Sequence, residues 1–579
     1  MYADTVLLNG KIATVDDRFT IVEALAIKDG RISDADTNAK VKAKIGPETK
    51  VIDLKGKVAL PGACDAHMHA VSTGLLLRPE TLDLKAVRSL AEMRGLLADA
   101  VKTAKKGEWI FGSGIQEYKI PELIDGGWRL VREDLDSVTK GNPVAIMDAE
   151  HHTLIVNSKA LEAAEFDSNL REPEPEEGFV GRGADGELNG RFTGFGAIGL
   201  ISQHIPVLTE AELEDCVLRT QRLLNSQGIT CHNDMLGAGG NFIMRDTFGE
   251  RPIYVYEKLR RERKLTARVT INYFAAEGGV HRGDSIIKGV QNAGLPEFRE
   301  KKWVQVQGVK LFGDTMEIWN DEGVGRSVFP GSTEAGQIAE IEYTVSRLHK
   351  MGYQILTYAI GARMVDVIVG AYVKAQEDYP REDPRHIIVL GDGVGERHMS
   401  DMKKHGIGVS CQPISFPGLS MLHRGTGGEA AFNWQMYSDK GIVLAAGSGY
   451  SSTVRDEISR RPVSRDETSR RPGGRDEMSW RPASWLEGLR HAMVRDTIRG
   501  DVTRGDHGMS LEDGIRMYTT GAAWQDRAEA WRGSLEPGKV ADIQVLGEDI
   551  FIVKKERIGA IPIVMTIVDG KTVYERTGR

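Results

Sequence analysis

Helical and strand-like segments alternate through the middle of the chain, and this alternation limits the fold more than any other feature. Helical stretches at 90–106, 208–228 and 338–352 carry apolar residues three and four positions apart. Short apolar runs typical of buried strands lie at 109–114, 143–150, 229–235, 304–314, 354–361, 386–393, 406–413 and 442–449. Strands that alternate with helices form a parallel sheet, and about eight such units favour a TIM-like (β/α)8 barrel over a doubly wound sheet.

Both ends of the chain are rich in β-structure. Short runs broken by Asn-Gly, Asp-Gly and Lys-Gly turns fill residues 5–60, and similar runs lie at 540–547 and 562–575. We therefore predict a small β-sandwich domain formed by both termini, residues 1–60 and 533–579, beside a barrel of residues 61–532. Two unrelated terminal sheets are the alternative.

A low-complexity repeat interrupts the last part of the predicted barrel. Residues 454–483 are three consecutive decapeptides, VRDEISRRPV, SRDETSRRPG and GRDEMSWRPA. The regularly spaced prolines prevent a continuous helix, and balanced charge with few apolar side chains leaves little to bury. The pattern predicts a solvated loop insertion made by repeat expansion, with a lid or a partner-binding arm as the alternative.

Composition narrows the class of function. The chain has 75 Lys and Arg against 83 Asp and Glu, and this net charge of −8 argues against nucleic acid or an anionic membrane as a partner. Four scattered cysteines without a CxxC pair exclude a disulfide framework. We see no signal peptide and no apolar run long enough to span a membrane, and we expect a cytoplasmic protein that binds a small molecule.

The strongest chemical signal is the segment LPGACDAHMHA at residues 60–70. A strand ends at Leu60, and Pro61 and Gly62 turn the chain before the two histidines. In an extended segment residues i and i+2 point to the same side, so His67 and His69 would direct two imidazoles at one point. Two nitrogen ligands suit a divalent metal such as zinc.

This motif and GSLEPGKVADIQVL at 533–546 resemble the amidohydrolase superfamily, and more narrowly amidohydrolase family 3, the branch that includes N-substituted formamide deformylase. The segments at 151–161, 228–235, 308–314 and 445–450 are similar to the same family, and the resemblance covers nearly the whole chain except the repeat. It implies a metal-dependent barrel with a β-sandwich from both termini. It also implies hydrolysis of an amide or formamide C–N bond in a small organic substrate.

The resemblance assigns the metal ligands one by one. His67 and His69 match the first-strand ligands, and Lys310 matches the fourth-strand lysine that many relatives carboxylate to bridge two metals. Three other positions are replaced: Tyr358 and Leu390 stand where the family has histidines, and Gly449 stands where it has the aspartate that binds metal and takes a proton from water. A catalytic zinc needs about three protein ligands, so we predict at most one ion, on His67, His69 and Lys310.

These replacements leave three functions open. The chain is a hydrolase with an atypical mononuclear site, a non-hydrolytic enzyme (lyase, hydratase, isomerase or cyclase) on the same fold, or an inactive ligand-binding protein. The expected proton-transfer residues are Tyr358, Asp392 and His152. The expected substrate contacts are His152, His232, Asp234 and Trp319. A homodimer is a possible assembly.

Overall fold

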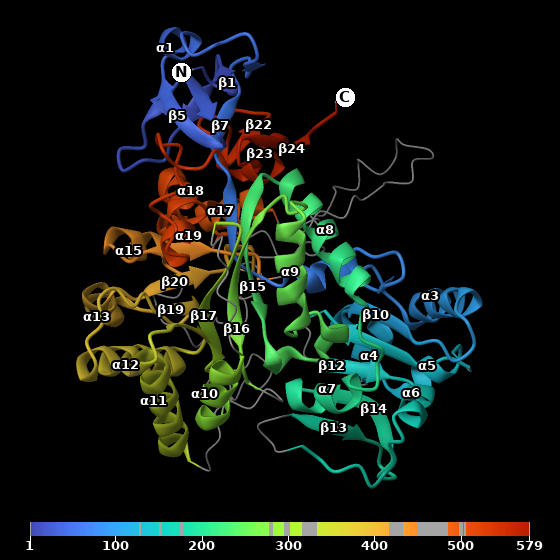
Figure 1. Ribbon diagram of the computed structural model, residues 1–579. Helices are drawn as coiled ribbons and strands as arrows, with labels where there is room; N and C mark the ends of the chain where they lie inside the picture. Colours follow the sequence, from blue (N-terminus) through green and yellow to red (C-terminus); the bar gives the residue numbers. More distant parts are fainter. Residues whose placement is uncertain are drawn as a thin grey trace.

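A nearly closed barrel of eight parallel strands forms the centre of the molecule, in the order β21-β20-β19-β18-β17-β16-β15-β8 (Figure 1). The computed structural model describes residues 2–126, 129–139, 141–149, 153–173, 178–276, 282–293, 302–314, 333–415, 432–449, 484–496, 502 and 505–577. The barrel strands are β8 (Ala63–Met68), β15 (Ile229–Leu236), β16 (Arg268–Phe274), β17 (Val304–Phe312), β18 (Gln354–Ala359), β19 (Ile387–Leu390), β20 (Gly408–Cys411) and β21 (Leu444–Ala446). The predicted TIM-like fold is confirmed.

Helices cover the outside of this barrel, and their sequences explain their ends and faces. Helix α8 (Glu210–Ser226) begins with a capping box in which Thr209 and Glu212 bond each other's backbone N–H groups. Its buried residues recur at three- and four-residue spacing, so one face packs on the barrel. The other covering helices are α9 (Arg251–Arg261), α10 (Gly283–Asn292), α11 (Glu334–Lys350), α12 (Ala362–Asp378), α13 (Met399–His405), α15 (Trp434–Asp439), α17 (Trp485–Val494), α18 (Leu511–Met517) and α19 (Thr520–Gln525).

A second sheet lies beside the barrel, between β8 and β15 in the chain (Figure 1). Its order is β13-β14-β12-β11-β10-β9. The strands are β9 (Leu82–Asp83), β10 (Ile110–Ile115), β11 (Val144–Asp148), β12 (Thr153–Val156), β13 (Phe179–Arg182) and β14 (Leu188–Thr193). Together with α3 (Leu90–Thr103) and α5 (Arg132–Asp136), strands of this sheet enclose a hydrophobic cluster of their own.

Two of the apolar runs that we expected in the barrel, 109–114 and 143–150, belong to this side sheet. Their places in the barrel are taken by β8 and β16. A strand buried on both faces reads as the same apolar run in either sheet, so periodicity cannot separate the two. The β16 strand escaped notice because polar residues interrupt it: Arg268 is buried against Asp542, and the Thr270 hydroxyl bonds Asp526.

Strands from the two ends of the chain pair directly. A six-stranded sheet has the order β24-β23-β22-β7-β2-β3, and a four-stranded sheet has the order β5-β4-β1-β6. Leu7 and Leu25 of the smaller sheet share a buried cluster with Ile543 and Ile567 of the larger one. The strands are β1 (Thr5–Leu8), β2 (Lys11–Ala13), β3 (Ile21–Val22), β4 (Ala24–Lys28), β5 (Arg31–Asp36), β6 (Lys50–Asp53), β7 (Val58–Pro61), β22 (Ile543–Leu546), β23 (Ile563–Val568) and β24 (Lys571–Glu575). The domain boundaries stay a prediction, and the 454–483 repeat lies outside the described residues.

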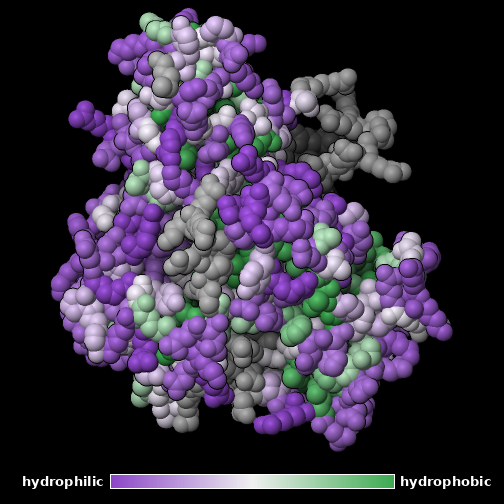
Figure 2. Space-filling view, viewed as in Figure 1, coloured by the Kyte–Doolittle hydropathy of each residue, from purple (hydrophilic) through white to green (hydrophobic). Residues whose placement is uncertain are grey.

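Most of the face shown in Figure 2 is hydrophilic, in keeping with the charged share of 27%. Phe179, Phe242 and Tyr254 are the exposed aromatic side chains on and near the side sheet and α9.

No helix in the described ranges is long and apolar enough to cross a membrane. The homodimer stays a prediction.

Two buried histidines form a chain of hydrogen bonds that requires both to be neutral. The Ile355 N–H donates to His386 Nδ1 (3.1 Å), so the His386 proton is on Nε2, which lies 2.8 Å from His349 Nδ1. His349 Nε2 then donates to the Tyr379 carbonyl (2.8 Å). Burial, and then the nearby Arg381 charge, lowers the pKa of His349, and burial lowers that of His386 well below its ordinary value.

We therefore expect stability to fall as the pH drops below about 6.5. At these pH values the two histidines bind protons in the unfolded chain but stay neutral in the folded one. Each of them therefore lowers the free energy of unfolding by up to roughly 2 kcal/mol at pH 5. Replacing His386 with Gln keeps both hydrogen bonds without the titration. Urea unfolding between pH 5 and 8 should show a smaller pH dependence for this variant, and an unchanged slope would contradict the assignment.

Candidate active site

Four of the residues predicted from the sequence lie at the carboxyl ends of barrel strands, where active sites of such barrels form. His67 is in β8 and His69 directly follows it, Lys310 is in β17, and Tyr358 is in β18. Asp392 follows the end of β19 by a short left-handed turn in which Leu390 has φ +68°. The structure thus collects His67, His69, Lys310, Tyr358 and Asp392 at one end of the barrel.

The backbone holds the two histidines in place. Their ring centroids are 5.5 Å apart with the planes at 76°. The Asp65 carboxylate accepts the N–H groups of His67 (3.3 Å) and Ser448 (2.9 Å), which ties the end of the barrel's last strand to its first. Gly447 is pressed against the His67 backbone, since an added Cβ would lie 2.4 Å from His67 N.

Both imidazoles are in the neutral form, the form that binds metals. Burial, and then the positive charge of Lys310, lowers the pKa of His69 to about 3 and that of His67 well below its ordinary value. Lys310 lies at the same carboxyl end of the barrel as both rings. His69 Nδ1 is buried and has no hydrogen-bond partner among the described residues.

Lys310 is the most unusual residue of the site. Its side chain is 1% exposed, and its Nζ bonds no group in the described part of the chain. The Phe312 and Tyr358 ring centroids lie 5.1 and 5.6 Å from Nζ, and burial lowers the pKa of the amine from 10.5 to about 7. Buried polar groups almost always find a partner. The two neutral imidazoles fit the nitrogen ligands of a zinc ion, and the Lys310 amine, unbonded among the described residues, offers a third nitrogen.

A pair of buried carboxyl groups flanks Tyr358. Asp314, at the end of β17, accepts the N–H groups of Ile360 (3.1 Å) and Gly361 (2.8 Å) at the start of α12. Burial, and then the nearby Asp314, raises the pKa of Asp392 to about 8, and burial raises that of Asp314 to about 6. The sequence analysis missed Asp314, although a carboxylate directly after the strand GVKLFG was the available signal.

The remaining predicted residues are placed elsewhere or lie outside the described residues. Asp234 accepts the Tyr256 hydroxyl (3.0 Å) from α9 and the Ala70 N–H (3.1 Å), and the His232 ring centroid lies 6.0 Å from that of Tyr256. These contacts put both residues on the side of β15 that packs against α9. His152 and Trp319 lie outside the described residues.

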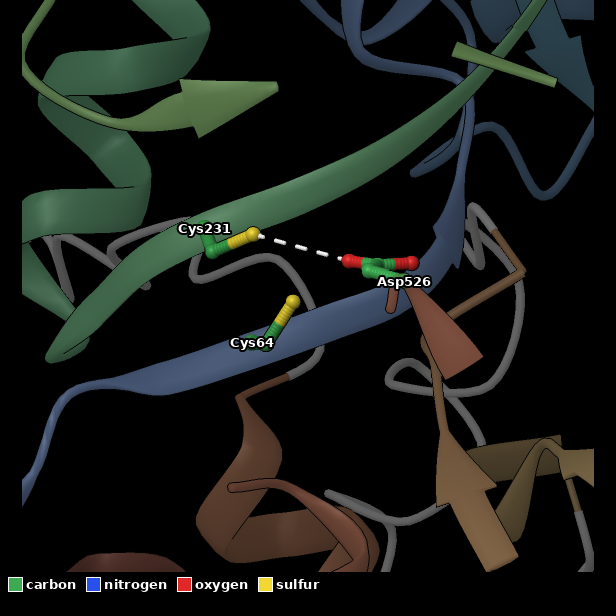
Figure 3. Close-up of side chains that lie close together, drawn as sticks. All are labelled: Cys64, Cys231 and Asp526. Carbon is green, nitrogen blue, oxygen red and sulfur yellow. Dashed lines mark hydrogen bonds between the residues drawn. The ribbon is translucent and has the colours of Figure 1, made fainter. Parts of the chain in front are cut away.

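A polar cluster that the sequence did not reveal lies near the other end of the barrel strands. The Cys64, Cys231 and Asp526 side chains converge there, with potential ligand atoms within 4.8 Å of one another (Figure 3). The Asp526 carboxylate accepts Asn233 Nδ2 (2.7 Å), the Thr270 hydroxyl (3.0 Å) and the Arg532 guanidinium. A cation would lie beside that guanidinium, and burial keeps the pKa of Cys64 well above its ordinary value, so we interpret the cluster as structural.

The chain is thus a TIM-like barrel with two histidines and a buried lysine at the carboxyl ends of its strands. The solved structure of an uncharacterized metal-dependent hydrolase from Pyrococcus horikoshii OT3 has this fold, with a TM-score of 0.68 at 20% identity over 95% of this chain and 99% of that one. The chain belongs to the amidohydrolase family, whose sequence profile matches residues 50–460 and 469–574. The predicted family is confirmed.

Two curated relatives match nearly end to end. N-substituted formamide deformylase of Arthrobacter pascens is 24% identical over 99% of this chain and 99% of its own length. The protein YtcJ of Bacillus subtilis (strain 168) is 24% identical over 98% of this chain and 99% of its own length. These relatives support an enzyme of the amidohydrolase type, and the substrate is a separate question.

Proposed function

We propose that this protein hydrolyses a C–N bond, of the amide or formamide type, in a small organic substrate. The single observation that carries the proposal is the buried Lys310 amine. It has no bonding partner among the described residues and lies at the same end of the barrel as His67 and His69. Such a donor set costs stability and is explained by a bound cation. The formamide deformylase among the relatives supports this bond type.

His67, His69 and Lys310 would hold one divalent ion, zinc, with Lys310 as the free amine or carboxylated. A bound zinc supplies an activated water near neutral pH and polarises the carbonyl group of the substrate. The protein's own groups must then move protons. Asp392, with a pKa near 8, is protonated at neutral pH, so it would donate a proton to the leaving amine. Tyr358, half-buried beside Lys310, and His152 are the other proposed proton-transfer residues.

The proposed substrate contacts differ in how they act. His152 and Trp319 would contact the substrate directly. Asp234 would act indirectly, because its carboxylate accepts the N–H of Ala70, the residue after His69. His232 lies on the same side of β15 and would help to hold Asp234 in place. A cytoplasmic location stays a prediction.

A second function is favoured by one observation. Gly449 and Leu390 place no coordinating atom at the ends of the eighth and sixth barrel strands, where the resemblance expects metal ligands. Chemistry without an activated water, such as a lyase, hydratase, isomerase or cyclase reaction, would instead use Asp392 and Tyr358 as the acid and the base.

The metal content of the purified protein tests the proposed metal site. We expect the purified protein, dialysed against zinc and measured by elemental analysis, to hold one ion per chain at most. Replacing both His67 and His69 with Ala should reduce the content to background, because Lys310 is then the one remaining ligand and cannot hold the ion alone. Two ions per chain would contradict the proposed site and would show that other ligands replace the missing ones.

Activity is then measured on a panel of small formamides and amides, with release of the amine followed by mass spectrometry. Zinc-loaded protein that releases amine at a rate above the double alanine variant supports hydrolysis. Zinc-loaded protein that leaves the whole panel intact would shift the assignment to the non-hydrolytic function.

A further inference from the structure

Gln412 occupies the space that a side chain at position 449 would need. Gly449 follows β21 with φ +61°, and its N–H donates to the His67 carbonyl (2.8 Å). A Cβ added to Gly449 would lie 2.0 Å from Gln412 Oε1 and 2.6 Å from its Nε2. Any residue larger than glycine therefore requires Gln412 to move.

The carboxamide of Gln412 is free to contact a ligand. Gln412 directly follows β20, so it lies with the carboxyl ends of the barrel strands, and its side chain is half-buried. Its amide makes no hydrogen bond to the residues that the structure describes, although its backbone carbonyl accepts the Ser415 N–H (3.0 Å). The Gln412 amide, with no bond to the described residues, thus stands beside Gly449, whose own backbone is bonded to that of His67.

We propose that Gln412 faces the metal position and supplies its amide oxygen there, in place of the side chain that residue 449 lacks. The inference rests on the proposed metal site of His67, His69 and Lys310. An amide oxygen is a neutral ligand of the hard type, and it cannot accept a proton from water at neutral pH. Gln412 thus completes the contacts of the ion, while proton transfer falls to other groups such as Asp392.

Zinc binding to the apo protein, measured by isothermal titration calorimetry, tests the placement. Gln412→Met removes the amide at nearly constant volume, and we expect the zinc affinity to fall about tenfold with an unchanged melting temperature. Gln412→Glu places a carboxylate in the same volume and should raise the affinity about tenfold. Gln203→Met, at an exposed position after α7 (Phe195–Ser202), is the matched control and should bind zinc like the wild type.

A substitution at Gly449 tests the same space from the other side. Gly449→Ala should weaken zinc binding in the wild-type background, because the new Cβ displaces the Gln412 amide. It should add no further loss in a Gln412→Ala background, and this non-additivity is the signature of a shared volume. Melting temperatures show the cost of alanine at positive φ, which is the same in both backgrounds.

The outcomes separate the two proposals. If the wild type binds zinc and Gln412→Met binds it equally well, Gln412 is not a metal-facing residue and the proposed function stands. Equal losses from Gly449→Ala in both backgrounds overturn the inference in the same way. If the wild type binds no zinc and Gln412→Glu binds none either, both the metal site and this inference are wrong. If Gln412→Glu alone binds zinc, the placement of Gln412 is supported.

Discussion

Replacing Lys310 with methionine should abolish the proposed activity and at the same time stabilise the fold. The amine is buried with no hydrogen-bond partner among the described residues, and burial lowers its pKa to about 7. Methionine fills a similar volume without a charge, and such replacements of buried charges often stabilise a protein by roughly 1 to 4 kcal/mol. Loss of a group that acts on the reacting centre costs about a hundred- to a thousandfold in rate.

The gain in stability should depend on pH in a defined direction. The pKa of the lysine is 10.5 in the unfolded chain and about 7 in the folded one, so the unfolded state binds more protons between these values. Wild-type stability therefore rises with pH across this window, and the advantage of the methionine variant is largest at pH 7 and below. It should shrink as the pH approaches 10.

Urea unfolding of the apo protein, together with zinc content and amine release, measures all three effects. Lys374→Met is a matched control, because Lys374 is exposed and pairs with Asp378 on the surface of α12, where such pairs contribute about 0.5 kcal/mol or less. A lower free energy of unfolding for the Lys310 variant than for this control would contradict the prediction. It would mean that the buried amine makes interactions that stabilise the folded state.

Removing the guanidinium near the other end of the barrel should have the opposite result: a large loss of stability with zinc binding unchanged. Asp526 is fully buried, and Arg532 is its ion-pair partner. Arg532→Met leaves that carboxylate without a cation in the protein interior, and breaking a buried ion pair in this way costs about 3–5 kcal/mol. Zinc content should not change, because His67 and His69 lie at the other ends of the strands.

A second substitution distinguishes loss of the ion pair from loss of packing. Arg532→Met combined with Asp526→Asn removes both charges. The oxygen of the new carboxamide can still accept the Asn233 amide, and its NH2 group can face the Thr270 hydroxyl, which accepts as well as donates. This double variant should recover a large part of the lost free energy of unfolding. A single Arg532 variant that loses less than about 1 kcal/mol would show that the ion pair contributes little.

The fold was predictable from the sequence because the evidence for it is local. The alternation of helical and strand-like runs predicted a barrel, and the strand ACDAHM placed His67 and His69 close together as their two-residue spacing required. Which of the apolar runs form the barrel and which form the side sheet was less predictable. The side sheet and the barrel both use short apolar strands, and only packing shows that the runs at 109–114 and 143–150 belong to a separate sheet.

The candidate site was predictable only in part. The family resemblance pointed to His67, His69 and Lys310, and the replacements at Tyr358, Leu390 and Gly449 are visible in the sequence itself. The residue that fills the space beside Gly449 is not visible in the sequence. Gln412 and Gly449 follow neighbouring strands, and their contact results from the pairing of β20 with β21, which no sequence spacing encodes.

By itself, the sequence determined the class of fold, the family and the two-histidine motif, since these depend on periodicity and on residues close together along the chain. The tertiary structure alone decided that the Lys310 amine has no hydrogen-bond partner among the described residues, that burial and then Asp314 raise the pKa of Asp392, and that Cys64, Cys231 and Asp526 converge. Each of these depends on strand register, which brings together residues far apart in the chain, and on burial, which sets how much an unpaired charge costs.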